Sequence, residues 1–352
     1  MTYIRNAWYV SAWAHDIAPE RPVGVQILSE PILIWRNAAG DLAAFEDRCV
    51  HRLAPLSLGR CEGDRLRCMY HGWLYDRTGR VVAIPGQGQI SESARVRTYP
   101  VVERHGCVWV WMGDAAAADE GLIPPVVGLD NPDYILGHGH LDFAAQALLV
   151  NDNLLDLSHV RFLHAKSAPL SEAWAQERPR FTARERSVHT EWWIRGESPK
   201  PGELGDTYTR SDFYVPGVLL VTDRGYPRGT ADKLNGQEPN LERPPFNLFC
   251  HLVSPMTDRA TRYFYCVGSH RDYGDHAVRA RDNLMGITER AFAEDKKMIE
   301  AQQHNIDITP GWRFMPATAD RGVILFNRLV EKLAREEIAL LSPASPTISA
   351  HR

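Results

Sequence analysis

The sequence contains no run of about 18 apolar residues, which is the length that a membrane-spanning helix needs. Its first ten residues, MTYIRNAWYV, lack the apolar stretch behind a basic start that is typical of an export signal. The net charge is only -4, and no basic cluster suited to nucleic acid is present. We therefore expect a cytoplasmic protein that binds neither a membrane nor nucleic acid.

Cysteine is scarce, with six residues in a chain of 352, and no export signal accompanies them. Such thiols stay reduced, which favours metal binding or packing over a disulfide framework. No G-x-G-x-x-G follows a predicted strand, the nearest approach being Gly86-Gln87-Gly88 in a predicted loop. We therefore do not expect the chain to bind NAD(P)H itself, and electrons for a redox reaction must come from another protein.

Short apolar runs separated by turn residues fill the N-terminal part of the chain, from residue 8 to residue 111. Runs that recur about every ten residues in this way indicate an all-β unit. The predicted strands lie at 25–28, 31–35, 42–46, 73–76, 80–84 and 107–112. Residues 37–40 and 76–79 predict hairpin connections, and 113–120 is the candidate linker.

The remainder of the chain mixes strand and helix patterns. Strands are predicted at 134–143, 191–194, 213–222, 246–255 and 262–268, and helices at 148–163, 282–304 and 322–341. This order indicates an α+β domain, an antiparallel sheet with helices to one side. Because 352 residues exceed what one core usually organises, we place one domain at 1–115 and a second at 116–342. We expect a disordered tail at 343–352.

Two Cys/His pairs lie in the predicted all-β unit. Cys49 and His51 form the first pair, and Cys68 and His71 follow sixteen residues later. Two thiolates and two imidazoles suit either tetrahedral zinc or a [2Fe–2S] cluster with its cysteines on one iron and its histidines on the other. Zinc ribbons and fingers favour pairs of like residues, so the mixed pairs favour the cluster. Cys61, between the pairs, is expected to be a buried thiol.

A second group of possible metal ligands lies in VNDNLLDLSHVRFLHA, residues 150–165. On a regular helix Asp156 and His159 share a face, whereas His159 and His164 are ~140° apart. The helix must therefore end or bulge between the histidines if both are to reach one metal. Two imidazoles and a carboxylate leave open positions for O2 and substrate, as in non-haem Fe(II) oxygenases. Asp156 is either that carboxylate or a residue that orients His159.

The predicted helix at 282–304 offers a more distant carboxylate, Asp295. The apolar residues that share its side of the helix are Leu284, Ala291, Phe292, Met298 and Ile299. An unpaired buried carboxylate costs several kcal/mol, so Asp295 should meet a metal, a cation or strong donors. A salt bridge with an arginine is the structural alternative. Glu294 points ~100° away and is expected to be a solvated charge.

Residues 49–79, which end in Tyr-His-Gly-Trp-Leu-Tyr-Asp-Arg-Thr-Gly, resemble the Rieske motif of ring-hydroxylating and O-demethylating oxygenases. FAEDKKMIEAQQ, residues 292–303, resembles the family segment whose aspartate is an iron ligand. The resemblance covers nearly the whole chain, but the sequence departs from the family at 144–148 and cannot be matched at 187–237. The sequence most resembles the oxygenase (alpha) components of the vanillate O-demethylase, toluenesulfonate methyl-monooxygenase and dicamba O-demethylase group.

This resemblance implies an all-β Rieske domain followed by a helix-grip-like catalytic domain. The residues it assigns to a Rieske [2Fe–2S] cluster are Cys49, His51, Cys68 and His71. The residues it assigns to a mononuclear Fe(II) are His159, His164 and Asp295. It also implies a homotrimer, in which His71 of one subunit bonds to Asp156 of the next and Asp156 holds His159. Asn153 matches a position close to the iron, and His251 matches one that contacts a substrate carboxylate.

The implied function is that of the terminal oxygenase of a multicomponent Rieske monooxygenase in aromatic compound catabolism. NAD(P)H serves it indirectly, through a separate reductase with a flavin and its own iron–sulfur cluster. The expected substrates are O2 and a small aromatic acid, which is O-demethylated or hydroxylated on a methyl group. The alternatives are a cis-dihydroxylating oxygenase, a Rieske electron carrier without oxygen chemistry, and a zinc-stabilised structural protein.

Overall fold

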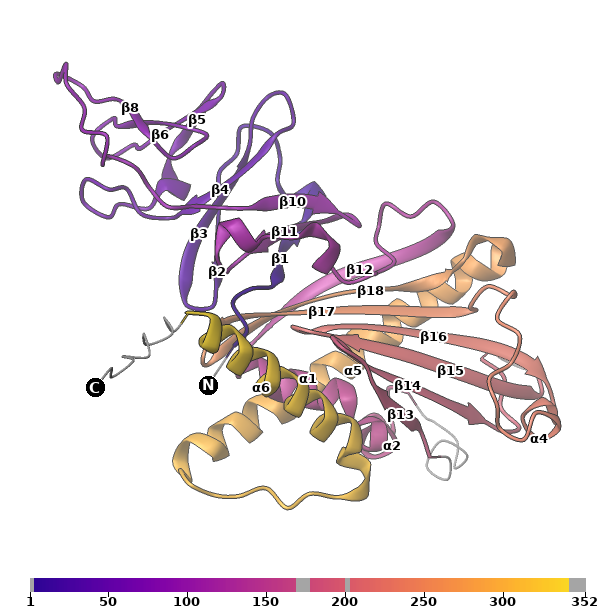
Figure 1. The fold of residues 1–352 in the computed structure, drawn as a ribbon. Helices are drawn as coiled ribbons and strands as arrows, with labels where there is room; N and C mark the ends of the chain where they lie inside the picture. Colours follow the sequence, from indigo (N-terminus) through magenta and orange to yellow (C-terminus); the bar gives the residue numbers. More distant parts are fainter. Residues whose placement is uncertain (1–2, 169–177, 200–202, 342–352) are drawn as a thin grey trace, which may run out of the picture.

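The computed structural model describes residues 3–168, 178–199 and 203–341, so the tail predicted at 343–352 lies outside the described residues. Three small antiparallel sheets form the N-terminal part, and a seven-stranded antiparallel sheet with helices against one of its faces follows (Figure 1). The predicted α+β fold, with an all-β N-terminal domain, is confirmed. The candidate linker at 113–120 contains one short 3-10 helix, η3 (Ala115–Ala117), and a second, η4 (Glu120–Leu122), begins at its last residue.

The N-terminal sheets are built from short strands joined by tight turns, as the sequence predicts. One sheet has the order β1-β11-β10, the second β2-β3-β4-β9 and the third β5-β6-β7-β8. The strands are β1 (Trp8–Trp13), β2 (Val23–Ile27), β3 (Glu30–Arg36), β4 (Leu42–Glu46), β5 (Arg60–Glu62), β6 (Arg65–Arg67), β7 (Leu74–Asp76), β8 (Val81–Ala83), β9 (Thr98–Tyr99), β10 (Val101–Arg104) and β11 (Cys107–Trp111). The β5–β8 sheet lies at the end of the molecule farthest from the large sheet (Figure 1).

The large sheet has the order β12-β18-β17-β16-β15-β14-β13, with every neighbouring pair antiparallel. Its strands are β12 (Tyr134–Phe143), β13 (Arg180–Ala183), β14 (Ser187–Ile194), β15 (Gly205–Tyr214), β16 (Val218–Pro227), β17 (Asn247–Thr257) and β18 (Ala260–His270). The strand predicted at 213–222 is wrong, because a turn divides it between β15 and β16, where Tyr214 pairs with Val218. Pro216 and Gly217 form this turn, and the predicted strand includes them although a Pro-Gly pair favours a turn.

Two long helices cross the sheet and meet a shorter, interrupted one. The α-helices are α1 (Ala147–Leu155), α2 (Val160–Leu163), α4 (Thr230–Lys233), α5 (Asp275–Ile308) and α6 (Arg321–Leu341). The remaining 3-10 helices are η1 (Ala14–Asp16), η2 (Leu56–Leu58), η5 (Leu157–His159), η6 (Arg271–Tyr273) and η7 (Thr318–Asp320). None of the helices in the described part of the chain is both long and apolar enough to cross a membrane.

Both faces of the large sheet are covered. On one face Phe213 contacts Phe326 of α6, with ring centroids 4.4 Å apart. On the other, apolar side chains of β16, β17 and β18 pack against the tryptophans of β1 and β11. These tryptophans, all nearly inaccessible to solvent, are Trp8, Trp13, Trp109 and Trp111. The central strands are therefore buried on both sides, which explains their nearly continuous apolar sequences.

Asp223 of β16 is a buried carboxyl group without a countercharge. It follows Leu219 and Val221 on the helix-facing side of the strand, since side chains alternate. Thr209 Oγ1 donates to it at 2.8 Å and Asn247 Nδ2 at 3.4 Å, and no lysine or arginine of the described residues forms an ion pair with it. Burial raises the pKa of Asp223 to about 6, because the two hydrogen bonds offset only part of the desolvation.

Asp223→Asn is expected to stabilise the protein at neutral pH. The pKa of Asp223 is about 6 in the folded state and 3.8 in the unfolded chain. Folding stability therefore falls as pH rises from the lower to the higher value. The variant lacks this loss and should be more stable by up to about 3 kcal/mol at pH 8, and by about half as much at pH 5. Urea unfolding followed by tryptophan fluorescence measures both values. An equal difference at the two pH values would contradict a raised pKa.

Candidate functional site

The two loops that carry the Cys/His pairs have the same backbone geometry. In the first, Cys49 N donates to Ala54 O and Leu53 N to Cys49 O, both at 2.8 Å. Leu53 has a φ of 56°, which is rare for a residue with a side chain. The loop therefore closes on itself and turns the Cys49 and His51 side chains toward the second loop.

The second loop repeats this arrangement. Cys68 N donates to Trp73 O at 2.8 Å, and Gly72 N to Cys68 O at 2.9 Å. Gly72 takes the place of Leu53, with a φ of 75°. A Cβ atom at Gly72 would also lie only 2.9 Å from Pro85 Cγ, so the position has both a conformational and a steric reason for glycine.

The side chains of the two loops suit a metal cluster with two sulfur and two nitrogen ligands. Cys49 and Cys68 are buried, and burial raises the pKa of the Cys68 thiol, so a thiolate here needs a compensating cation. The rings of His51 and His71 lie 4.6 Å apart. His51 Nδ1 is buried without a hydrogen-bond partner among the described residues, as a ligand nitrogen would be. These residues fit the cluster, and Tyr75 Oη adds a hydrogen bond to Cys49 Sγ.

The histidines of the second group are presented by an interrupted helix. α1 ends at Leu155, and Asp156 is extended, with φ -107° and ψ 95°. Its carboxylate accepts a hydrogen bond from Ser158 N at 2.8 Å and so starts η5, which ends at His159. α2 then stops at Leu163, and His164 is its C-cap. The helix thus ends between the two histidines, as their angular separation requires.

Asp295 of α5 meets both imidazoles. Its Oδ1 lies 3.5 Å from His159 Nε2 and 3.3 Å from His164 Nε2, and one ligand atom from each of the three residues fits within 4.8 Å. Asp295 and His164 are buried, whereas 23% of the His159 side chain is exposed. Asn153 Nδ2 donates to the same carboxylate oxygen at 2.9 Å and lies 3.3 Å from His159 Nε2.

This carboxylate is ionised despite its burial. Desolvation alone would raise the pKa of Asp295, but hydrogen bonds from His159 and His164 lower it to about 2. Burial would likewise lower the pKa of His164, yet Asp295 and Glu294 raise it above its ordinary value. A negative oxygen faced by two ring nitrogens is a donor set that suits iron or another divalent cation. The arginine considered as its partner is absent from the described surroundings of Asp295.

The other nitrogens of the two histidines have different partners. His159 Nδ1 lies 2.5 Å from the main-chain oxygen of Asp156, so Asp156 contacts this ring through its backbone and not through its carboxylate. His164 Nδ1 lies 2.9 Å from Glu294 Oε2, which also accepts a hydrogen bond from Ser167 Oγ at 2.6 Å. Glu294 is 32% exposed, so the prediction of a solvated charge is right only in part: its carboxylate also binds two side chains.

The helical pattern around Asp295 is only partly confirmed. Ala291 and Ile299 are buried, as predicted, but 55% of Met298 is exposed. Phe292 turns toward β18 and β17, where its ring lies 5.0 Å from that of Tyr265 and 5.9 Å from that of His251. The buried side of α5 is thus narrower than the apolar residues of the sequence suggest.

His251 lies on β17, on the side of the sheet that faces α5. Its Nδ1 is 2.5 Å from Tyr263 Oη, and Phe249 and Phe292 flank the ring. Burial lowers the pKa of His251 to about 4, so the imidazole is neutral at physiological pH. A neutral histidine among aromatic side chains can form one hydrogen bond with a ligand and remain uncharged.

A cavity of about 620 Å³ opens between η5 and the helix-facing side of β14–β16, and its described lining includes the neighbours of His159 in η5 but none of the candidate iron ligands. Leu154, Trp192 and Leu219 form part of its apolar wall, and Asp156 and Arg161 lie along it. A larger groove of about 1160 Å³ lies between the end of α5 and residues 309–314, and its described lining also includes none of the candidate metal ligands.

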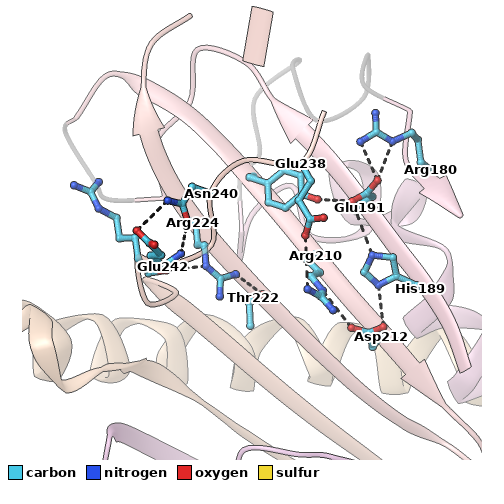
Figure 2. A network of polar contacts seen from close by, with 12 residues as sticks. Arg180, His189, Glu191, Arg210, Asp212, Thr222, Arg224, Glu238, Asn240 and Glu242 are labelled. Atoms are coloured by element: carbon cyan, nitrogen blue, oxygen red, sulfur yellow. Dashed lines mark hydrogen bonds and ion pairs between the residues drawn. The ribbon is translucent and has the colours of Figure 1, made fainter. Parts of the chain in front are cut away.

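Residues 187–237, which the resemblance leaves unmatched, form β14, β15, β16 and α4. Figure 2 shows a polar network on these strands and the neighbouring β13, in which His189 Nδ1 lies 2.8 Å from Asp212 Oδ1 and Arg180 Nη2 of β13 lies 2.9 Å from Glu191 Oε1. Arg210 adds a contact of 3.4 Å to Asp212. Val188 and Phe213 point toward the helices, so His189 and Asp212 point to the opposite face, away from Asp295. The network is therefore separate from the candidate iron site.

Comparisons with known protein families agree with this geometry. The family described as "Rieske [2Fe-2S] domain" matches residues 7–100, and "Vanillate O-demethylase oxygenase C-terminal domain" matches residues 143–336. The first match contains the two Cys/His loops, and the second contains both histidines of the interrupted helix and Asp295.

Full-length relatives extend the match. The iron-sulfur subunit of the toluene-4-sulfonate monooxygenase system of Comamonas testosteroni is 32% identical, over 95% of this chain and 98% of its own length. The oxygenase component of dicamba O-demethylase from Stenotrophomonas maltophilia is 30% identical, over 96% of this chain and 100% of its own. A crystal structure of dicamba monooxygenase bound to dicamba superimposes with a TM-score of 0.82 at 28% identity, covering 96% of this chain and 100% of that one. The chain therefore belongs to the Rieske non-haem iron oxygenases, as an oxygenase component related to vanillate O-demethylase and dicamba O-demethylase.

Proposed function

We propose that this oxygenase holds its [2Fe–2S] cluster with Cys49, His51, Cys68 and His71, and its mononuclear iron with His159, His164 and Asp295. The observation that carries the second assignment is the position of two Nε2 atoms around the buried, ionised carboxylate of Asp295. We place the boundary between the Rieske domain (1–115) and the catalytic domain (116–342) in the segment of short 3-10 helices.

We infer that the substrate is a small aromatic acid that loses a methyl group from oxygen, or is hydroxylated on a methyl carbon. The relatives are named for toluene-4-sulfonate, vanillate and dicamba, all of which fit this class. When bound, the cluster supplies single electrons and the iron activates O2. Neutral His251 would give one hydrogen bond to the acid group, and the aromatic side chains around it would exclude water from the bound ring. Asn153 keeps one Asp295 oxygen oriented.

We further propose that electrons reach the iron from a neighbouring subunit of a homotrimer. His71 is exposed, and the carboxylate of Asp156 contacts only Ser158 N in the described part of the chain, so both can meet a partner subunit. A cytoplasmic reductase with a flavin and an iron–sulfur cluster would supply these electrons from NAD(P)H, since this chain shows no dinucleotide-binding motif.

Asp295→Ala is expected to abolish turnover while leaving the cluster intact. Its loss leaves two imidazoles without a charged ligand, so the iron content should fall from about three to about two per chain. Iron assay together with the visible absorption of the cluster measures the effect. Cys68→Ser is the complementary variant and should lose the cluster absorption. Unchanged iron content in Asp295→Ala would refute the ligand assignment.

The reaction type can be read from the products of a substrate screen. Purified oxygenase, a reconstituted reductase and NADH are incubated with methoxylated, methylated and sulfonated aromatic acids. O-demethylation releases formaldehyde and a phenol, hydroxylation of a methyl group gives a benzylic alcohol, and cis-dihydroxylation gives a diol without formaldehyde. We expect formaldehyde or a benzylic alcohol in proportion to the NADH consumed, after subtraction of uncoupled oxidation. A diol as the main product would overturn the proposed reaction.

Mixed subunits test the route of the electrons. A His71→Ala chain lacks a cluster ligand and an Asp295→Ala chain lacks an iron ligand, so each should be inactive alone. Rings that contain both chains should recover part of the activity, because an intact cluster in one chain then faces an intact iron site in the next. Two differently tagged chains, purified in tandem, provide the mixed rings. Mixed rings without activity would show that the cluster and iron communicate within one chain.

A further inference from the structure

We propose that Glu294 is a positioning residue for the iron site: it fixes the ring of His164 so that Nε2 faces the metal, and Ser167 fixes Glu294. The inference rests on the proposed iron ligands. It adds two residues that do not contact the metal themselves, and one of them was expected from the sequence to be a solvated charge.

The His164 ring is held at both nitrogens by consecutive carboxylates of α5. Glu294 Oε2 lies 2.9 Å from Nδ1, and Asp295 Oδ1 lies 3.3 Å from Nε2. A histidine that binds a metal through Nε2 must be neutral and must carry its proton on Nδ1. A carboxylate beside Nδ1 favours the tautomer with its proton on Nδ1 and fixes the plane of the ring. It also makes Nε2 a stronger ligand for the metal.

Ser167 completes the arrangement from the segment that follows α2. Its hydroxyl donates to the same oxygen of Glu294 at 2.6 Å, and only 6% of the residue is exposed. Ala168 N donates to His164 O at 2.8 Å, so His164 and Ser167 belong to one turn. The Glu294 carboxylate therefore joins this turn to α5 and limits the freedom of the His164 ring.

The two histidines depend on different kinds of acceptor. His159 Nδ1 faces a main-chain carbonyl, which no substitution removes, whereas His164 Nδ1 faces a side chain. A carboxylate is the stronger acceptor of the two because it is charged. Substitution of Glu294 should therefore weaken the hold on the iron through His164 alone and leave His159 in place.

The test compares Glu294→Ala, Glu294→Gln and Ser167→Ala with Glu289→Ala, which removes an exposed carboxylate from the same helix. The measurement is the rate at which a ferrous chelator removes iron while the visible absorption of the cluster stays constant. Loss of the partner of a ligating histidine should accelerate release by about 10- to 100-fold in Glu294→Ala. Glu294→Gln should lie between, because its amide oxygen still accepts from Nδ1, and Ser167→Ala should show a smaller increase.

Three outcomes decide the question. Release rates in this order, with Glu289→Ala like the parent and the thermal midpoint of the iron-free proteins unchanged, would support the proposal. A Glu294→Gln or Glu294→Ala protein that retains iron like the parent would overturn it, as would a lowered midpoint of the iron-free protein with normal release. An incorrect assignment of the iron ligands would be distinguishable from these outcomes. In that case the unsubstituted protein would hold no mononuclear iron, or the Asp295→Ala protein would retain it. If Glu294→Ala does not fold, the nearly isosteric Glu294→Gln carries the test.

Discussion

A charge buried inside the catalytic domain is the constraint on which the rest of its structure depends. The side chain of Asp295 is 8% exposed and remains ionised, which is stable only if donors or a cation surround it. α1 must therefore be interrupted at Asp156 so that two imidazoles can approach, and Asn153 must remain on α1 to donate to the same oxygen. Glu294, next along α5, then reaches the far side of one of these rings.

The fold could be predicted where one sequence signal dominates. The strands at 42–46 and 134–143 have the predicted bounds, because turn residues mark their ends clearly. The prediction at 213–222 fails because the apolar residues on both sides of the turn outweigh the turn signal of Pro216 and Gly217. The start of α5 at Asp275, seven residues before the predicted one at 282, also escapes the sequence, since the first turns are largely polar and exposed.

The residues of the site could likewise be predicted where the signal is local in the sequence, and not where it depends on contacts between distant segments. Spacing alone groups the Cys49 and Cys68 loops, and an apolar helix face singles out Asp295. The helical pattern correctly predicts that Glu294 points away from Asp295. It does not reveal that the backbone turn containing His164 and Ser167 packs against Glu294. The contact of Asp156 with His159 through the backbone is equally hidden, because sequence names side chains and not the carbonyl groups that a break in a helix exposes.

The order in which the chain is synthesised separates the two proposed metal sites in time. All four residues proposed to hold the cluster have left the ribosome once His71 and its turn emerge, whereas the proposed iron site lacks its carboxylate until Asp295 follows. The contact between the two ends of the chain forms last. In it, the Glu337 carboxylate of α6 accepts hydrogen bonds from the main-chain N–H groups of Arg5 and Asn6, each at 2.8 Å. A chain that folds from its N-terminus can thus close the two Cys/His loops while the domain that contains Asp295 is still unfinished.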